Sequence, residues 1–311
     1  MRKFTTKLLL CCLLVCSLFV SQPETAKADT INGIQPILPV QYQKLLGKGM
    51  DVDWSKTKKG QETFHKTIVK DFKNAGINHV RIRVKDNVSQ DLFYHLDEQI
   101  RACLEAGIIP IIAYQANGFK NSASDEDMDK VVEWWSAVAE HYKNESYLLS
   151  FDMMIECTDA LNKQPDKLNE LYEKVVTAIR QTNPTRILMM SPRVRSDAQY
   201  LSELKVPTQA NGYMMAEWHF YASGPSKENE RKLWTTGTEK EKNLIRNKIQ
   251  LALEWQKKTG IPTWVGAWMA GNYNDGDDYS VKEQVIFAHF MVSELKKAGI
   301  PFDCKCRYTF L

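Results

Sequence analysis

The sequence predicts a (β/α)8 barrel, in which eight parallel strands alternate with helices. Strand-like and helix-like segments alternate regularly over about 270 residues, which is typical of a parallel sheet. Four helical segments are also followed by a glycine just before the next strand, and glycine is the residue that most often ends a helix. These junctions are Gly76-Ile77, Gly107-Ile108, Gly260-Ile261 and Gly299-Ile300. An open doubly wound sheet is the alternative, but no G-x-G-x-x-G motif follows a strand.

Eight segments have the composition of strands. HVRIRV at 79–84 is rich in β-branched residues, and 108–114 is continuously apolar, as in a strand buried on both faces. The full set is 45–54, 79–84, 108–114, 148–156, 186–191, 212–221, 262–267 and 301 onward. Residues 29–45, with Pro36 and Pro39, are expected to form a leader that lies across the domain.

Helices are predicted between these strands. The segment 125–142 begins with an acidic turn, which suits the dipole of a helix N-terminus. The predicted helices are 64–75, 92–106, 125–142, 166–182, 197–204, 239–259 and 281–298. No helical segment follows the eighth strand, so either the barrel closes unusually or its C-terminus is foreshortened.

Residues 1–28 are predicted to be a secretory signal peptide, which leaves 29–311 as one barrel domain. The segment has a basic start, an apolar core over 8–20 and a small-x-small cleavage site at 26–28. A membrane anchor is the alternative, but the apolar run is short for a span. We therefore expect a secreted protein, extracellular or at the cell surface, that is free of the membrane after cleavage.

Composition excludes some classes of function. The net charge of +3 is small, and no Lys/Arg stripe with interleaved aromatic residues indicates nucleic-acid binding. Of the seven cysteines, Cys103 and Cys157 are expected to be small buried or loop residues. Cys304 and Cys306 lack the spacing of a metal or redox motif. We expect no metal, no cofactor and a monomer.

Candidate catalytic residues lie at the ends of predicted strands. Glu156 ends the apolar run at 148–156, and the carboxyl ends of barrel strands line the active-site mouth. Because residues two apart on a strand share a face, Glu217, His219 and Tyr221 point the same way. The segment 262–272, PTWVGAWMAGN, is a second short apolar strand that opens into a Gly/Asn loop.

These strand ends resemble those of glycoside hydrolases of family 5, over nearly all of the mature chain. The resemblance implies a secreted hydrolase of O-glycosidic bonds in a β-linked poly- or oligosaccharide, cellulase-like or mannanase-like. Glu156 matches the proton donor on strand four, and His219 and Tyr221 match the H-x-Y motif of strand six. Arg81 matches the arginine on strand two that supports the nucleophile, and the nucleophile position itself is Ala267.

Two further positions depart from the family pattern. Ile155 stands where the resemblance implies an asparagine, and Gln115-Ala116 replaces a His-His pair. A retaining glycosidase needs two carboxyl groups about 5–5.5 Å apart, and an alanine cannot attack. A different carboxylate could serve as base for a water molecule, and the candidates are Asp51, Asp53, Glu217, Asp277 and Asp278. Glu217 could instead be a buried partner of Arg81 or Arg83.

The sequence thus leaves two main hypotheses, a glycoside hydrolase of doubtful competence and a carbohydrate-binding protein with the same fold. A barrel that uses Glu156 and His219 for another hydrolysis is a third. The candidate sugar-binding residues are Arg81, Gln115, Tyr221, Trp54 and Trp268. Both tryptophans are expected at loop mouths, where an indole could stack on a sugar ring, although either could be core. Arg81 could equally be a buried ion-pair partner.

Overall fold

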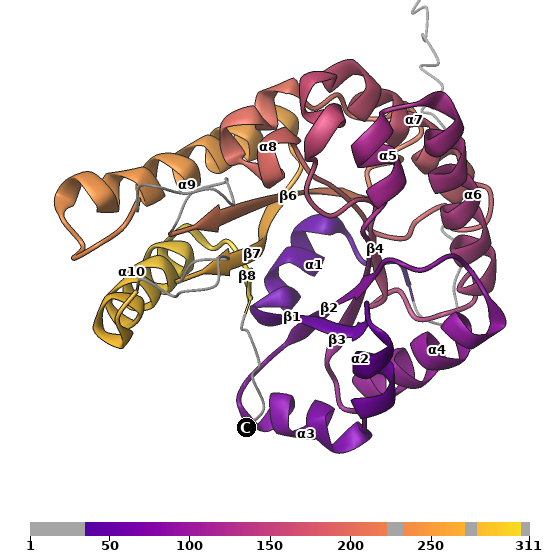
Figure 1. The fold of residues 1–311 in the computed structure, drawn as a ribbon, viewed down its shortest axis with the longest axis horizontal. Coiled ribbons are helices and arrows are strands. Elements are labelled where there is room, and N and C mark those ends of the chain that lie inside the picture. Colours follow the sequence, from indigo (N-terminus) through magenta and orange to yellow (C-terminus); the bar gives the residue numbers. More distant parts are fainter. Residues whose placement is uncertain (1–34, 223–232, 271–278, 306–311) are drawn as a thin grey trace, which may run out of the picture.

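The computed structural model describes residues 35–222, 233–270 and 279–305. In this part of the chain, eight strands form a closed parallel barrel in the order β1 to β8, with helices around it (Figure 1). The predicted (β/α)8 barrel is confirmed. The predicted signal peptide and the last six residues lie outside the described ranges. None of the described helices is long and apolar enough to cross a membrane.

The strands agree with their predicted positions but are shorter at several ends. The predicted fourth strand, for example, continues to Glu156, whereas the observed one ends at Asp152. The strands are β1 Lys48–Ser55, β2 His79–Val84, β3 Ile109–Tyr114, β4 Ser150–Asp152, β5 Leu188–Met190, β6 Met214–Tyr221, β7 Thr263–Met269 and β8 Phe302–Cys304.

The helices also follow the prediction closely, with several additions. The predicted helix 64–75 is observed as α3, an unpredicted helix α2 precedes it, and a short helix follows β3. The α-helices are α1 Pro39–Leu46, α2 Lys58–Thr63, α3 Lys66–Asn74, α4 Gln90–Glu105, α5 Asn117–Ser122, α6 Asp125–His141, α7 Pro165–Arg180, α8 Arg193–Ser196, α9 Glu239–Thr259 and α10 Val281–Ala298. Two 3-10 helices, η1 Asp159–Lys163 and η2 Ala198–Glu203, lie in the loops after β4 and β5.

Glycines end four helices just before a strand, as predicted. Gly76, Gly107, Gly260 and Gly299 have φ angles of 75°, 68°, 72° and 68°, in the left-handed region that favours glycine. The isoleucine after Gly107 and the one after Gly299 each donate a backbone hydrogen bond back to the preceding helix. These four turns set where each helix stops and therefore where the next strand begins.

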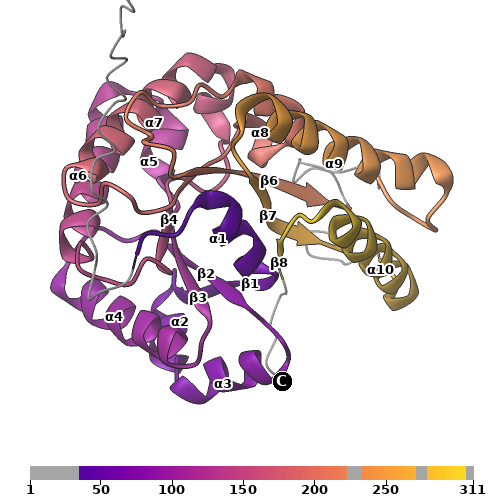
Figure 2. The ribbon, with the colours of Figure 1, turned by 180° about the vertical axis from the view of Figure 1, so that it is seen from behind.

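Helix α1 closes the amino-terminal end of the barrel, where a leader strapped across the domain had been expected. Its Tyr42 and Leu46 are fully buried against apolar side chains inside the barrel, including Ile111 and Trp264. The Tyr42 hydroxyl donates to the Leu148 carbonyl oxygen at 2.8 Å. Seen from behind, α1 lies in the middle of the molecule, against the strands (Figure 2). The barrel therefore has a hydrophobic floor and opens at its carboxyl-terminal end.

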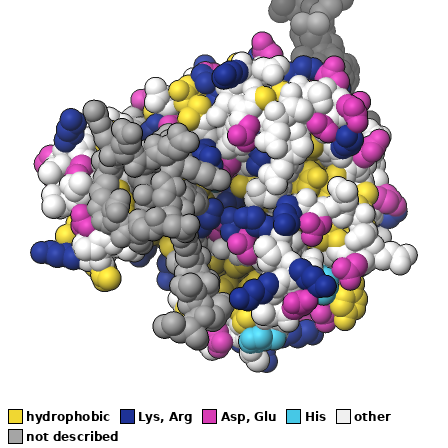
Figure 3. All heavy atoms as spheres, viewed as in Figure 1, with side chains coloured by type: hydrophobic (Ala, Val, Ile, Leu, Met, Phe, Trp, Pro, Cys, Tyr) yellow, Lys and Arg dark blue, Asp and Glu magenta, His cyan; other side chains and the backbone are white. Residues whose placement is uncertain are grey.

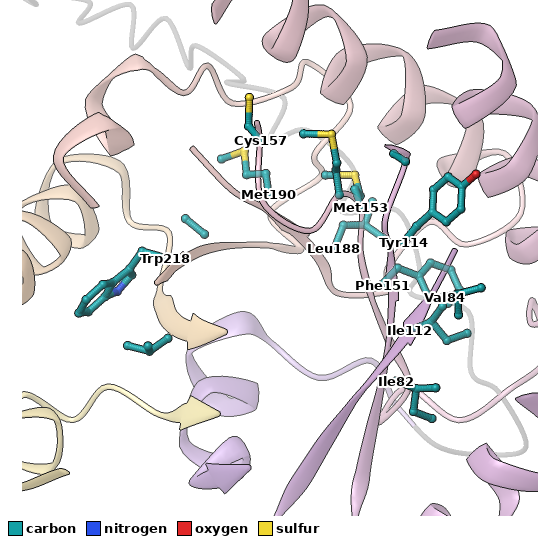
Figure 4. Packing of buried hydrophobic residues seen from close by; sticks show 14 of the residues in the cluster. Ile82, Val84, Ile112, Tyr114, Phe151, Met153, Cys157, Leu188, Met190 and Trp218 are labelled. Carbon is teal, nitrogen blue, oxygen red and sulfur yellow. The ribbon is translucent and has the colours of Figure 1, made fainter. Parts of the chain in front are cut away.

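Alternate strand residues point outward and form the main core beneath the helices. Ile82, Ile112 and Phe151 come from neighbouring strands and are completely buried. Figure 4 shows them with other members of the same cluster, namely Val84, Tyr114, Met153, Cys157, Leu188, Met190 and Trp218. The alternation leaves the inward positions for polar and charged residues above the floor.

Candidate active site

The mouth of the barrel brings together side chains from the ends of β4, β6 and β7. Glu156 follows β4, while His219 and Tyr221 lie on β6 and Ala267 lies on β7. His219 pairs with Ala267 in the strand register, so these two residues are direct neighbours. The expected convergence of these four positions is therefore observed.

Glu156 has three polar partners. Its Oε1 atom accepts a hydrogen bond from the Tyr221 hydroxyl at 2.5 Å and lies 3.1 Å from His219 Nδ1. Its Oε2 atom accepts a hydrogen bond from Nη1 of Arg195, on α8, at 3.3 Å. The Glu156 side chain is 14% exposed, so it reaches the surface of the mouth while most of it is buried.

These partners keep Glu156 ionised. Burial by itself raises the pKa of this carboxyl group, but the hydrogen bond and charge of His219, the charge of Lys305 and the hydrogen bond from Tyr221 outweigh it. The pKa of Glu156 is therefore well below its usual value of 4.5. An ionised carboxylate accepts hydrogen bonds and cannot give a proton to a leaving group.

A buried charge cluster lies directly below Glu156. Arg81 is 1% exposed and donates to Asp51 at 3.1 Å, to Asp152 at 3.2 Å and to Glu217. Glu217 in turn lies 2.6 Å from His219 Nε2, so the cluster is joined to the mouth through the imidazole ring. Arg81 is therefore an ion-pair partner beneath the site, and its donors bind these three carboxyl groups instead of a sugar.

The protonation states in this cluster follow from burial and charge. Burial and the neighbouring Glu217 carboxylate raise the pKa of Asp152 well above its ordinary value, although Arg81 and His219 act in the opposite direction. Burial lowers the pKa of His219, but Glu217 and Glu156 outweigh it and raise that pKa above 6.5. The two carboxyl groups that His219 bridges thus favour the protonated form of its imidazole ring.

Ala267 presents a methyl group where the resemblance implies a carboxylate. It is completely buried and packs with Tyr221 and Met269. The preceding Gly266 is an extra residue in the strand, because the pairing of β6 with β7 skips it. A Cβ atom on Gly266 would lie 1.7 Å from Glu217 Oε1, so the Glu217 carboxyl group occupies the space beside it.

The structure places both predicted stacking tryptophans away from the mouth. Trp54 is 8% exposed and lies against Phe64 and Phe72, with ring centroids 4.9 and 5.8 Å away. Trp268 is 4% exposed and packs on Phe287 of α10. Both rings are part of the core between the strands and the helices, which corrects the expectation that they stack on a sugar.

The remaining candidates differ in their access to the mouth. Gln115 follows β3 and is partly exposed, so its role in sugar binding stays a prediction. Asp51 and Glu217 are buried in the Arg81 cluster, and Asp53 forms ion pairs with Arg83 and Lys56. The other two candidate bases, Asp277 and Asp278, lie outside the described residues.

Sequence reasoning did not single out Lys120 or Arg195, which both lie near Glu156. Lys120 is on the short helix α5 after β3, and Arg195 is in the α8 turn after β5. Their positions just after strands could have indicated a place at the barrel mouth. That indication is weak, because lysine and arginine are common on protein surfaces in general. No described group of three or more His, Cys, Asp or Glu side chains could hold a metal ion.

The fold and the site together define a class of protein: a (β/α)8 barrel with a carboxylate after β4 and an H-x-Y motif on β6, as in glycoside hydrolases. Residues 40–302 match the family model described as Cellulase (glycosyl hydrolase family 5). The chain therefore belongs to glycosyl hydrolase family 5.

Individual relatives are distant. Endoglucanase H of Acetivibrio thermocellus is 23% identical over 215 residues, which are 66% of this chain and 23% of that protein. A beta-xylosidase of Phanerodontia chrysosporium is 21% identical over 63% of this chain and 45% of its own length. The matches thus span less than half of these two relatives. The structure of Thermotoga maritima Cel5A in complex with mannotriose has a TM-score of 0.77 at 20% identity, over 87% of this chain and 93% of that one.

Proposed function

We propose that the barrel mouth binds a β-linked oligo- or polysaccharide and that the protein hydrolyses it slowly or not at all. The observation that carries this proposal is Ala267, a buried methyl group at the position of the family nucleophile. Retaining hydrolysis needs a nucleophilic carboxylate opposite the acid. Loss of a nucleophile costs about four orders of magnitude or more in rate.

The state of Glu156 supports binding over cleavage. With its low pKa, the carboxylate is an acceptor for sugar hydroxyl groups, and the contact with His219 below it holds it in place. The Tyr221 hydroxyl, which donates to Glu156, keeps the two side chains in fixed relative positions. Such pre-ordered polar groups suit recognition of a hydroxyl-rich ligand.

The relatives support the class of ligand. They are named as an endoglucanase and a beta-xylosidase, and one solved neighbour is described in complex with mannotriose. The ligands and substrates that these names imply are β-linked sugars, so we extend that class to this chain as part of the proposal.

Hydrolysis with Glu156 as proton donor is the second candidate. The observation that favours it is the intact contact between Glu156, His219 and Tyr221. A sugar that displaced Arg195 from Glu156 would remove one of the positive charges near the carboxylate and raise its pKa. Under this candidate, the nucleophile or base would be another carboxylate or water.

Calorimetry and a reducing-end assay on the same samples separate the two candidates. Cello- and manno-oligosaccharides are titrated into the protein and into Glu156→Gln, and both are assayed for turnover. We expect binding to the unmodified protein, weaker binding to the variant, and equally negligible turnover in both. Turnover that Glu156→Gln abolishes would establish the hydrolase instead. Absence of binding to any β-glycan would overturn the proposal.

We also propose that the protein acts outside the cytoplasm as a monomer, after removal of residues 1–28. The basic and apolar pattern of that segment supports export. N-terminal sequencing of protein from a culture supernatant should give a start near Asp29. A protein that stays in the cell with an intact N-terminus would contradict export. Sedimentation should give the mass of one chain, which tests the monomer.

A further inference from the structure

Positive side chains surround Glu156 at the mouth. Arg195 contacts it directly at 3.3 Å. The side chains of Lys120, Lys305 and Lys56 are close enough for electrostatic attraction between each of them and Glu156. Each of the four comes from a different part of the barrel rim. Lys56 follows β1, Lys120 is on α5 after β3, Arg195 follows β5 and Lys305 follows β8. The face seen in Figure 3 has Lys and Arg side chains gathered near its centre.

Lys120 is the most informative of these residues because it is buried. It is 5% exposed, and its ammonium group donates to the backbone carbonyl oxygen of Ile155 at 2.9 Å. An ammonium group has three donors, and among the described residues no carboxylate lies within ion-pair distance of this one. A buried charge without an ion pair is expensive to maintain, so a positive group held here points to an anionic ligand.

Electrostatics of the neighbouring groups agree with that interpretation. Burial, with Arg195 adding to it, lowers the pKa of Lys120 to about 8 in spite of the attraction of Glu156. Burial together with Arg83 lowers the pKa of Lys305 to about 8 as well. Both groups are therefore still mostly charged at neutral pH, although the nearby negative groups offset the cost of their burial only in part.

Arg195 is held in an unusual backbone conformation. Val194, Arg195 and Ser196 have φ angles of 56°, 54° and 60°, and Glu156 has a φ of 52°. Three consecutive non-glycine residues in the left-handed region are costly, and such strain concentrates at functional sites. The turn places the guanidinium group beside Glu156, where its planar donors could also pair with a ligand carboxylate.

We propose that the glycan bound at this mouth is acidic, a β-linked chain with carboxylate groups on its sugars, and that Lys120 and Arg195 bind one of those carboxylates. This rests on the proposed function, because it specifies the ligand of the same site. Glu156 takes the hydroxyl groups of the sugar, while the surrounding positive charges take its carboxylate. Residues with this role determine specificity, since a neutral glycan would leave the buried Lys120 without a carboxylate at ion-pair distance among the described residues.

The test compares two series of ligands, one with a carboxylate at C6 of each sugar and one with a neutral hydroxymethyl group there. Oligosaccharides of β-1,4-linked glucuronic acid and cello-oligosaccharides of equal length share their linkage and differ at C6. We expect the acidic series to bind with a dissociation constant at least roughly tenfold lower than that of the neutral series at about 50 mM salt. The part of the preference that comes from the partly exposed Arg195 should shrink at about 500 mM salt, because salt screens exposed charge pairs more than buried ones.

Variants assign the preference to named residues. Lys120→Gln and, separately, Arg195→Gln should each weaken binding of the acidic ligand at least roughly fivefold while changing the neutral ligand less than roughly twofold. Lys44→Gln is the matched control, because Lys44 is an exposed lysine on α1 at the closed end of the barrel. It should leave both affinities unchanged. Two separate variants keep the test valid if one of them folds poorly.

The outcomes separate this inference from the proposed function. Equal or tighter binding of the neutral series would overturn the acidic-ligand proposal and leave glycan binding in place. Binding of neither series would overturn both. An acidic preference that survives both Lys120→Gln and Arg195→Gln would also overturn the assignment of these residues.

Discussion

The carboxyl group of Glu217 occupies the space beside Gly266 that any side chain at that position would need. A Cβ atom there would lie 1.7 Å from Oε1 and 2.5 Å from the carboxyl carbon of Glu217. Glu217 cannot easily move aside, because it is completely buried and paired with Arg81 and His219. The glycine and the buried glutamate are therefore structurally dependent on each other.

Gly266→Ala should consequently destabilise the protein by about 2–4 kcal/mol, since overpacking a buried site forces side chains or backbone to shift. The measurement is the free energy of unfolding in urea. Gly118→Ala is the control, because the nearest atom to a Cβ there is 3.6 Å away. Its effect should stay below about 1 kcal/mol. A Gly266→Ala protein as stable as the control would show that Glu217 relaxes freely.

Ala267→Glu should create measurable retaining glycosidase activity. The new carboxylate would lie beside Tyr221 and across the mouth from Glu156, which supplies the pair of groups that the mechanism needs. We expect release of an activated phenol from an aryl β-glycoside to rise at least roughly a hundredfold over the unmodified protein.

Ala267→Gln is the control of equal size, and it should remain inactive. Adding Glu156→Gln to Ala267→Glu should remove the gained activity on unactivated glycans. If azide or formate instead gives turnover in the unmodified protein, the missing nucleophile is its sole defect. A folded Ala267→Glu protein without any turnover would mean that the mouth no longer fits the transition state.

Replacing the buried Lys120 should stabilise the protein. Its pKa falls from 10.5 to about 8 on folding, which corresponds to about 3 kcal/mol of unfavourable free energy while the group is charged. Lys120→Met should therefore raise the free energy of unfolding by about 1–3 kcal/mol at pH 7, since the Ile155 carbonyl loses a donor in return.

The sign of the pH dependence checks the cause. The penalty is present in full below pH 8 and fades as pH rises toward 10.5, so the advantage of Lys120→Met should fade over the same range. Denaturation in urea at several pH values measures it. A constant difference between the two proteins would mean that packing, not charge, is responsible.

His219 should make stability fall as pH rises above neutrality. Its folded pKa is raised above 6.5 by Glu217 and Glu156, so its stabilising contribution is complete below pH 6.5 and is lost as pH rises through the folded pKa. Comparing urea midpoints between about pH 6 and about pH 8.5 tests this.

His219→Gln should abolish that part of the slope, whereas the exposed His65→Gln should keep it. Glu156 behaves in the opposite sense. Because its folded pKa is lowered, its contribution is present above pH 4.5 and disappears as pH falls through the folded value. A His219→Gln protein with an unchanged pH profile would contradict the bridging role.

Sequence patterns were sufficient to predict the fold, because the glycines that end helices and the alternation of strands with helices can be recognised from neighbouring residues. Gly76, Gly107, Gly260 and Gly299 each mark the end of a helix in the structure. The convergence of Glu156, His219 and Tyr221 followed from their places at strand ends together with the family resemblance. Helix α1 was missed because its packing partners are long-range, inside the barrel floor.

The two tryptophans show where counting along a strand needs more than sequence. Trp54 has the same parity as the outward Val52, whereas Asp51, just before Val52, faces inward to Arg81, so alternation already placed the indole outside. Trp268 differs, because two-residue counting from the inward Trp264 puts it inside. The extra residue Gly266 reverses that parity, and a bulge of this kind is not visible in the sequence.

The floor made by α1 sets a limit on how this protein can be shortened. Tyr42 and Leu46 seal the amino-terminal end of the barrel, and the Tyr42 hydroxyl also contacts Ser150 at 2.8 Å. A trimmed form that starts after Leu46 would expose apolar residues such as Ile109 and Met215 to water and invite aggregation. Affinity tags and fusion partners therefore belong ahead of Pro39, where residues 35–38 run into the helix from the surface.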